Sequence, residues 1–303
     1  MPRVTVVTAA LNASEYIAET IQSVLQQTYR DFEYVVIDDG SSDDTVEVVS
    51  RFGPRVTLVQ QRNSGVGGAR NRGFEIAAGE YVAVVDADDV WAPDKLEQQV
   101  CSMDASPQAG VCYTDCSSMG ADGSVLEESM IVTHPPLDCL ALMTSFSPIV
   151  TSSVMYRREL LEARPYRLDL ALAEDFYVHL KALWRSRGYA LFIDEPLVRY
   201  RKWDGSTLRK AGGWERGKMG LKSVEAFIED MSHEDPLSPR MIRDGIAFQH
   251  FLWAWYCIES GERLGFALHE LQRAAFQDPG LSGLAIRQVV KLMASRAGML
   301  RRA

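Results

Sequence analysis

The sequence has few cysteines and histidines, five of each among 303 residues, and no two cysteines form a C-x-x-C pair. An odd number of cysteines without that spacing favours neither a disulfide framework nor a zinc knuckle. Excess positive charge is also missing, because 32 basic and 41 acidic side chains give a net charge of −9. Broad nucleic-acid binding needs clustered lysine and arginine to neutralise phosphates, so this class of function is disfavoured.

Long apolar runs are missing as well. No uninterrupted run reaches the roughly 18 residues that a membrane helix needs, and the first residues lead into a strand pattern instead of an apolar leader. We therefore expect a cytoplasmic protein without a membrane span. Hydrophobic residues at 47% and charged residues at 24% are typical of globular proteins and exclude collagen, coiled coil and disorder.

Short β-branched runs alternate with amphipathic stretches over the first 85 residues. This alternation predicts βαβ units, and hence an α/β fold with a mostly parallel sheet flanked by helices. In such sheets ligands bind beyond the carboxyl ends of the strands. The expected strands cover residues 4–9, 32–37, 56–59 and 81–85, and the expected helices cover residues 14–25, 45–51 and 68–77.

The alternation becomes irregular after Asp89, and a helical pattern begins near Trp214. We predict a catalytic domain over residues 1–210, with nucleotide-sugar binding in 1–100 and the acceptor side in 101–210, and a helical region over 211–303. The expected elements in between are strands at 110–114, 153–156, 191–193 and 197–200, a hairpin or loop at 115–129, and a helix at 174–187.

Three carboxylates follow directly after an apolar strand in the segment Asp86-Ala87-Asp88-Asp89. In an extended chain alternate residues share a face, so Asp86 and Asp88 are expected to project together while Asp89 points away. Paired carboxylates at the end of a strand suit a hard divalent cation that also binds phosphate oxygens. The alternative is a solvated acidic turn before the next helix.

A second acidic segment, Asp38-Asp39-Gly40-Ser41, ends another expected strand. A carboxylate there could accept the ring N–H of uracil or thymine, or the N–H edge of guanine. The alternative is that this segment only forms a turn and begins the next helix, since glycine permits a sharp turn and the polar residues that follow suit a helix N-terminus.

The glycine-rich segment at residues 63–73 leads into a helix that contains Arg70. Such loops can bind phosphates through backbone N–H groups. The dinucleotide fingerprint G-x-G-x-x-G fails, however, because Arg70 stands where the third glycine belongs. This departure disfavours a dehydrogenase, and Arg70 could instead offer a planar pair of donors to a diphosphate or a base.

Four segments, taken in order, resemble the family 2 glycosyltransferases of the GT-A fold. They are the first strand, the Asp38–Ser41 segment, the glycine-rich segment with Arg70 and the Asp86–Asp89 segment. The resemblance covers about residues 1–205 and implies an inverting hexosyltransferase. It implies that Asp39 binds the base of a nucleotide-sugar, first a UDP-sugar and next a dTDP-sugar. The implied donor-binding residues are Thr8, Ala9, Leu11, Asp39, Arg70, Asp86, Ala87 and Asp88.

The same resemblance implies that Asp88, with Asp86, binds Mn²⁺ or Mg²⁺. It assigns Glu174 and Asp175 to the family's acidic pair, with Asp175 as the general base and Glu174 on the acceptor side; the alternative is that both acids only complement a helix N-terminus. Leu11 stands where the family often has an aromatic residue. Trp203, which could stack on a sugar on the acceptor side, stands where the family often has a histidine, so the resemblance names no second metal ligand.

The acceptor implied is a saccharide or a lipid-linked sugar, as in the synthesis of polysaccharides, glycolipids or glycoconjugates. Residues 281–303 carry five basic and no acidic side chains, a pattern that predicts either peripheral contact with the inner face of the membrane or a helix packed on the protein. Two rival functions remain open. They are a non-catalytic nucleotide-binding scaffold and a sugar-phosphate nucleotidyltransferase.

Overall fold

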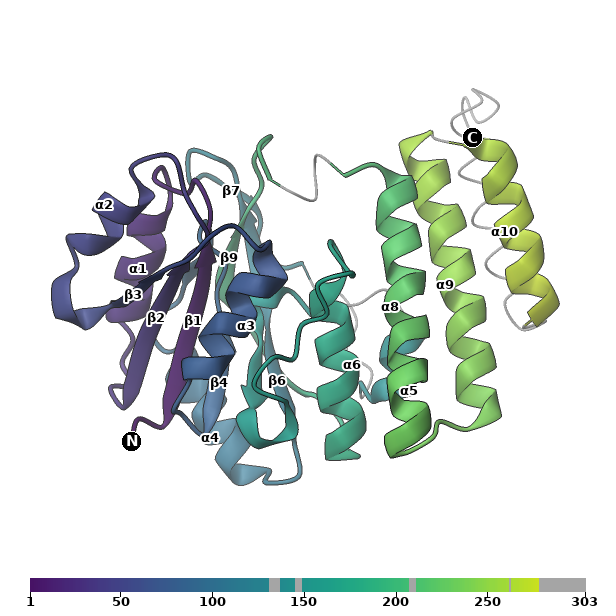
Figure 1. The fold of residues 1–303 in the computed structure, drawn as a ribbon, viewed down its shortest axis with the longest axis horizontal. Helices are drawn as coiled ribbons and strands as arrows, with labels where there is room; N and C mark the ends of the chain where they lie inside the picture. Colours follow the sequence, from purple (N-terminus) through teal and green to yellow (C-terminus); the bar gives the residue numbers. More distant parts are fainter. Residues whose placement is uncertain (131–136, 145–148, 207–210, 262, 278–303) are drawn as a thin grey trace. The chain divides into compact units, whose positions relative to one another are not determined.

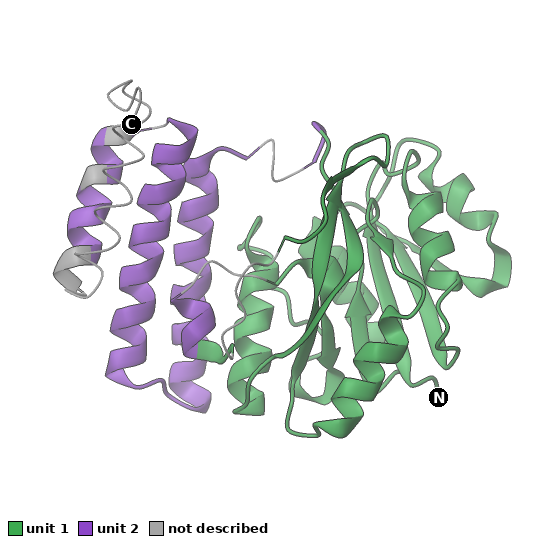
Figure 2. Ribbon diagram, turned by 180° about the vertical axis from the view of Figure 1, so that it is seen from behind, with its two compact units in different colours: residues 1–139, 148–203 green, residues 140–147, 204–303 purple. Residues whose placement is uncertain are grey.

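A computed structural model describes residues 1–130, 137–144, 149–206, 211–261 and 263–277 (Figure 1). The chain forms two compact units (Figure 2). Unit 1 comprises Met1–Cys139 and Pro148–Trp203, and unit 2 comprises Leu140–Ser147 and Asp204–Ala303. The predicted functional division of residues 1–210 into a donor part and an acceptor part stays a prediction.

The first part of unit 1 is a parallel sheet built from βαβ units, as expected. Strand β1 lies between β2 and β4, and β2 also pairs with β3, all in parallel. The strands are β1 (Val4–Ala10), β2 (Phe32–Asp38), β3 (Thr57–Gln60) and β4 (Tyr81–Val84), and the helices between them are α1 (Ile17–Leu25), α2 (Thr45–Ser50) and α3 (Val66–Ile76).

The second part of unit 1 extends this sheet with mixed pairing, in the order β3-β2-β1-β4-β8-β6-β9-β5, with β7 paired to β6. Strand β6 is parallel to β9 but antiparallel to β7 and β8. The α/β fold with flanking helices is thus confirmed, in a mixed form. The remaining elements of the unit are β5 (Val90–Trp91), α4 (Lys95–Ala105), β6 (Val111–Met119), β7 (Val125–Glu127), β8 (Met155–Arg157), α6 (Glu174–Ser186) and β9 (Leu191–Arg201), with short 3-10 turns at Gly53–Arg55, Thr151–Ser153 and Arg158–Leu160.

Two expected elements differ from the structure. Strand β6 continues to Met119 instead of ending at residue 114, because its second half pairs with β9 and is buried. Strand β9 is continuous where two short strands were expected. The register between β6 and β9 shifts around Asp115, opposite Pro196, and such an irregularity accommodates a proline that cannot donate a ladder hydrogen bond.

Alternating side chains of the parallel strands pack on opposite faces of the sheet. Val4, Val6 and Val36 belong to one apolar cluster with the buried faces of α1 and α4, whereas Val35 and Ile37 pack with Ala69 of α3. Helix α3 lies very close to β1, since a Cβ added to Gly73 would meet a methyl group of Val7 at 2.3 Å. This close contact fixes α3 over the strands that carry the polar residues described below.

Unit 2 is helical, as expected. Its helices are α5 (Cys139–Met143), α8 (Gly213–Glu234), α9 (Pro239–Ser260) and α10 (Leu264–Gln277). The first residue of α5, Cys139, still belongs to unit 1. Glycines permit close packing of α8 on α9, because a Cβ on Gly213 would lie 2.1 Å from the carbonyl oxygen of Tyr256. Across the described residues, none of the helices combines the length and the apolarity needed to cross a membrane. The basic stretch at 281–303 lies outside the described residues.

Candidate active site

The polar segments expected to bind a ligand lie at one edge of the sheet, where β1, β2 and β4 end (Figure 1). The backbone N–H of Asp39, just after β2, donates to the carbonyl oxygen of Ala10 at 2.8 Å. The N–H of Val85, just after β4, donates to the carbonyl oxygen of Val7 at 3.0 Å. The ends of the three strands are thus tied together, with their polar extensions side by side.

Asp39 presents one satisfied and one unsatisfied carboxylate oxygen. Its Oδ1 accepts hydrogen bonds from the Gln61 side chain at 2.8 Å and from the Ser64 backbone N–H at 2.9 Å. Its Oδ2 is buried and has no hydrogen-bond partner in the described part of the chain. A buried acceptor without a donor is costly, so this oxygen suits an N–H group brought by a ligand.

The end of β1 contributes residues of different accessibility. Thr8 is fully buried, and its hydroxyl lies 2.9 Å from the Tyr34 hydroxyl. Ala9 is half-buried, whereas Leu11 is 47% exposed. Leu11 is therefore accessible from solvent, whereas the buried hydroxyl of Thr8 already has a partner, and donor binding by these residues stays a prediction.

Arg70 of α3 joins two of the expected site residues. Its Nη2 lies 2.7 Å from Asp86 Oδ1 and its Nη1 lies 3.1 Å from Glu174 Oε1, and the whole side chain is buried. Burial and the neighbouring charge of Asp175 raise the pKa of Glu174 to about 7, although Arg70 opposes this shift. The two terminal nitrogens of the Arg70 guanidinium are therefore both engaged, one by Asp86 and the other by Glu174.

Asp88 is held from the end of β9. Its Oδ2 accepts a hydrogen bond from the Trp203 indole N–H at 2.7 Å, and its carbonyl oxygen accepts one from Arg201 Nε at 2.9 Å. The ring of Trp203 also contacts Tyr16 edge-on, with ring centroids 5.3 Å apart. Trp203 is thus placed against the acidic turn, and whether it also contacts an acceptor stays a prediction.

The acidic segment is a turn and not the extended chain that we expected. Strand β4 ends at Val84, and the backbone N–H of Asp89 donates to the carbonyl oxygen of Asp86 at 3.2 Å. Asp89 does point away from the other two, into the protein, where it accepts hydrogen bonds from the Ser152 hydroxyl and the Arg201 backbone N–H. The carbonyl oxygen of Ala87 accepts from Thr20 Oγ1 at 3.0 Å.

The acidic turn fits a divalent cation that takes few ligands from the protein. Burial and the nearby charge of Asp86 raise the pKa of Asp88, and a cation would relieve this repulsion. Within the described residues, no cluster of three or more His, Cys, Asp or Glu side chains is arranged to hold a metal ion. A cation at Asp88 would therefore need further ligands from a bound diphosphate, a mode typical of Mg²⁺ sites.

Asp175 is kept in its ionised form by its surroundings. It is in the first turn of α6, where it accepts hydrogen bonds from the Thr151 hydroxyl and, at 2.7 Å, from the Phe176 backbone N–H. Burial opposes its ionisation, but His179, Arg70 and these hydrogen bonds outweigh burial, so the pKa of Asp175 lies below its usual value. Asp175 is therefore a carboxylate at neutral pH.

Several residues that support the site were not singled out from the sequence. Gln61 and Ser64 hold Asp39, and the start of the glycine-rich segment could have indicated the second of them. Ser152 binds Asp89 and also accepts the Asp86 backbone N–H at 3.0 Å. Arg201 of β9 holds the acidic turn from a position more than one hundred residues away; it lies two residues before Trp203, in the segment Tyr200-Arg201-Lys202-Trp203 that resembles a family element, but the sequence assigned it no role.

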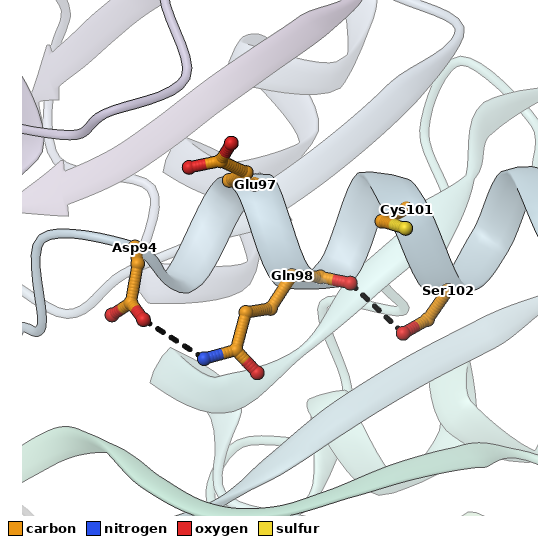
Figure 3. Close-up of a pocket in the computed structure, with 5 residues that line it drawn as sticks. All are labelled: Asp94, Glu97, Gln98, Cys101 and Ser102. Carbon is orange, nitrogen blue, oxygen red and sulfur yellow. Dashed lines mark hydrogen bonds between the residues drawn. The ribbon is translucent and has the colours of Figure 1, made fainter.

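A surface hollow along α4 is separate from these residues (Figure 3). Its lining comes from one helix face, where the Gln98 side chain donates to Asp94 and the Ser102 hydroxyl donates to the Gln98 carbonyl oxygen. None of the expected site residues lines it, so the hollow is not part of the candidate site.

Comparisons with known proteins agree with this geometry. The profile of the family described as Glycosyl transferase family 2 matches residues 5–163. An uncharacterized glycosyltransferase of Nostoc sp. is 36% identical over 173 residues, which are 53% of this chain and 52% of the relative. The putative teichuronic acid biosynthesis glycosyltransferase TuaG of Bacillus subtilis is 37% identical over 131 residues, 42% of this chain and 52% of that protein. The matches thus span about half the length of these relatives.

Two solved structures share the fold. Residues 1–349 of TarS from S. aureus, in complex with UDP-GlcNAc, superpose with a TM-score of 0.68 at 21% identity, covering 98% of this chain and 92% of that one. The mannosyltransferase PcManGT from Pyrobaculum calidifontis, in complex with GDP-Man and Mn²⁺, gives a TM-score of 0.63 at 22% identity, covering 98% and 80%. At such identities these similarities establish the fold alone.

Proposed function

The chain belongs to glycosyltransferase family 2 and has the GT-A fold, and from this premise we propose that it transfers a sugar from a nucleotide-sugar to an acceptor hydroxyl with inversion at the anomeric carbon. The observation that carries the proposal is the buried, unpartnered Oδ2 of Asp39 at the edge where the strands end. The donor that we propose is a UDP-sugar, with a dTDP-sugar next; uracil and thymine each offer a ring N–H to the Asp39 carboxylate, and guanine, which offers an N–H edge, is the base to test against them. The UDP-GlcNAc complex of TarS supports this choice.

The acidic turn would help to stabilise the nucleoside diphosphate as the leaving group. Asp88 would hold Mn²⁺ or Mg²⁺ together with the diphosphate, with Asp86 beside it, as the Mn²⁺ in the PcManGT complex suggests. When bound, such a cation stabilises the negative charge that develops on the leaving diphosphate. Trp203 and Arg201 keep Asp88 in place, and Arg70 limits the repulsion between Asp86 and the acidic pair of α6.

The Asp175 carboxylate acts as the general base in this proposal. A carboxylate with a lowered pKa remains ionised at neutral pH and can take the proton of an acceptor hydroxyl within hydrogen-bond distance. The Thr151 hydroxyl and the Phe176 N–H fix its orientation before the acceptor arrives. Glu174, bound to Arg70, lies on the acceptor side of the same helix turn.

The acceptor that we propose is a saccharide or a lipid-linked sugar, in the synthesis of a polysaccharide, glycolipid or glycoconjugate. The names of TuaG and of the succinoglycan biosynthesis protein ExoO from Rhizobium meliloti, 35% identical over 195 residues, support this context. The protein would act in the cytoplasm, with the basic stretch at 281–303 as a candidate contact with the inner face of the membrane.

Asp39→Asn tests the base pocket. We expect it to weaken UDP binding by about 10- to 100-fold, because a hydrogen bond to a charged acceptor contributes about 1.5–3 kcal/mol. CDP is the matched control ligand, because cytosine has no N–H at N3 and only its exocyclic amino group could donate to the carboxylate, so we expect a smaller loss of affinity for CDP than for UDP. Isothermal titration of both nucleotides with Mn²⁺ present measures the difference. Equal UDP affinities of wild type and variant would remove Asp39 from the pocket.

A further inference from the structure

The short 3-10 turn Thr151–Ser153 carries three hydroxyl side chains in succession. All three residues are buried, with Thr151 7% exposed and the two serines not exposed at all. A buried hydroxyl group is costly unless it is hydrogen-bonded. The partners of these side chains therefore show what the turn holds in place.

Ser152 holds the acidic turn of residues 86–89 at both of its ends. Its Oγ accepts a hydrogen bond from the Asp86 backbone N–H at 3.0 Å and donates one to the Asp89 side chain. Asp88 lies between these two attachments, so one hydroxyl oxygen fixes the chain on either side of it. A single side chain of the 3-10 turn thus positions the backbone that carries the carboxylate proposed to bind the cation.

Thr151, the neighbour of Ser152 in the chain, holds Asp175. Its hydroxyl donates a hydrogen bond to Oδ2 of Asp175, whose Oδ1 accepts one from the Phe176 N–H. A donated hydrogen bond orients a carboxylate and favours its ionised form. The residue proposed as the general base is therefore attached to the same 3-10 turn as the acidic turn.

The 3-10 turn is itself fixed from β5 and α4. The Trp91 indole N–H donates to the carbonyl oxygen of Ser152 at 2.8 Å, and the Gln99 side chain donates to the carbonyl oxygen of Ser153 at 2.9 Å. Trp91 and Gln99 are both buried, so water does not compete for these hydrogen bonds. The turn therefore cannot move without breaking buried hydrogen bonds.

We propose that Thr151 and Ser152 are positioning residues that set the spacing between the general base Asp175 and the cation-binding acidic turn. The inference rests on the proposed function and extends it to the residues that fix its geometry. Consecutive Cα atoms are about 3.8 Å apart, so two side chains on adjacent residues hold their partners at a nearly constant separation. Thr151 and Ser152 act through these carboxylates and not on the substrates.

A constant separation matters for transfer with inversion. The base must take the acceptor proton on one side of the anomeric carbon while the diphosphate leaves on the other side, and both groups must be in place at the same time. A misplacement of about 1 Å can cost about 100-fold in rate. Attachment of both groups to adjacent residues of one buried turn restricts such a misplacement.

Ser152→Ala tests the half of the proposal that concerns the cation. The variant deprives the Asp86 N–H and the Asp89 carboxyl group of their shared partner, so the acidic turn can shift. We expect the Mn²⁺ affinity of the UDP complex, measured by electron paramagnetic resonance of free Mn²⁺, to fall by about tenfold. Ser153→Ala is the matched control, because it is the same change in the same turn and the hydroxyl that it removes donates to the Val150 carbonyl oxygen at 2.7 Å. We expect the control to bind Mn²⁺ as wild type does.

Thr151→Val tests the half that concerns the base. Valine has nearly the same shape but no hydroxyl, so Asp175 loses a donor that orients it. With water as the acceptor, we expect kcat for UDP-GlcNAc hydrolysis to fall by about tenfold or more, while the donor KM and the Mn²⁺ affinity stay within about twofold. Thr151→Ser keeps the hydroxyl and should restore most of the lost kcat, which a purely steric role of the threonine would not do.

Two results would overturn the proposal. One is a folded Ser152→Ala protein with the Mn²⁺ affinity of wild type, and the other is a Thr151→Ser protein as slow as Thr151→Val. If Ser152→Ala does not fold, Trp91→Phe is the second variant, because it removes the donor to the Ser152 carbonyl oxygen. We expect Trp91→Phe to lower the Mn²⁺ affinity by a smaller factor, and an unchanged affinity would count against the role of Ser152.

The failure of this inference is distinguishable from the failure of the proposed function. Wild-type protein that hydrolyses none of the donors tested would contradict the proposed function, and the Mn²⁺ measurements would still decide the role of Ser152. Wild-type turnover that Ser152→Ala and Thr151→Val both leave unchanged would contradict the inference alone.

Discussion

Asp175→Asn should reduce turnover of the nucleotide-sugar by about 10²- to 10⁴-fold, the range that a general base contributes, while UDP affinity stays within twofold. The amide is nearly the same size, and its one oxygen can still accept the hydrogen bond from the Phe176 N–H while its NH2 group faces the Thr151 hydroxyl, but it cannot take a proton. Loss of the charge of Asp175 also removes one cause of the raised pKa of Glu174, so Glu174 becomes easier to ionise. UDP release and calorimetric UDP binding measure the two effects separately.

Asp31→Asn is the matched control for this variant, since Asp31 is exposed and precedes β2, at the opposite edge of the sheet from the site. We expect the control to behave as wild type. Glu174→Gln should be measured in parallel, because a buried carboxyl group with a pKa of about 7 is the other base within the acidic pair. Turnover retained by Asp175→Asn and lost by Glu174→Gln would transfer the role to Glu174.

Asp88→Asn should lower Mn²⁺ affinity of the UDP complex and reduce turnover by about 10²-fold or more, because stabilising the leaving diphosphate contributes several kcal/mol. The sign of the pH effect follows from the raised pKa of Asp88. As the pH falls toward that pKa, the proton competes with the cation, so wild-type Mn²⁺ affinity should weaken at lower pH and the variant should lose this dependence.

Electron paramagnetic resonance of free Mn²⁺, with saturating UDP at pH 7.5 and 5.5, measures this affinity directly. Asp94→Asn is a suitable control, because Asp94 lines the separate hollow along α4 (Figure 3). An Asp88→Asn protein that binds Mn²⁺ as tightly as wild type would show that the cation is held elsewhere.

The parallel half of the sheet is predictable from the sequence because each of its strands, helices and loops can be recognised from its own short stretch of residues. Strand β1 and the second half of β2 are rich in buried β-branched residues, and the polar residues Asp39 and Asp86 follow shortly after a strand ends. Since parallel strands place their carboxyl ends at one edge, the neighbourhood of these loops follows from the strand pattern.

The partners of the site residues are not predictable in this way. Arg70 meets Glu174 across more than one hundred residues of sequence, and Trp203 reaches Asp88 over a similar separation. The mixed half of the sheet brings these segments together, and its strands are short or polar, so their pairing depends on tertiary contacts that no single segment encodes. The turn at Asp86–Asp89 shows the same limit, because hydrogen bonds from Ser152 and Arg201 shape it.

Release of UDP from a UDP-sugar by the full chain is the most direct test of the proposed transfer. We would incubate the protein with UDP-glucose, UDP-GlcNAc, dTDP-glucose and GDP-mannose, each with Mn²⁺ or with EDTA, and follow the nucleotide and the anomeric configuration of the sugar by NMR. We expect Mn²⁺-dependent release of UDP or dTDP, with inversion of the sugar, and little release of GDP. Binding of nucleotide without release would support a scaffold, and turnover that persists in EDTA or retains the anomeric configuration would contradict the inverting, metal-assisted mechanism.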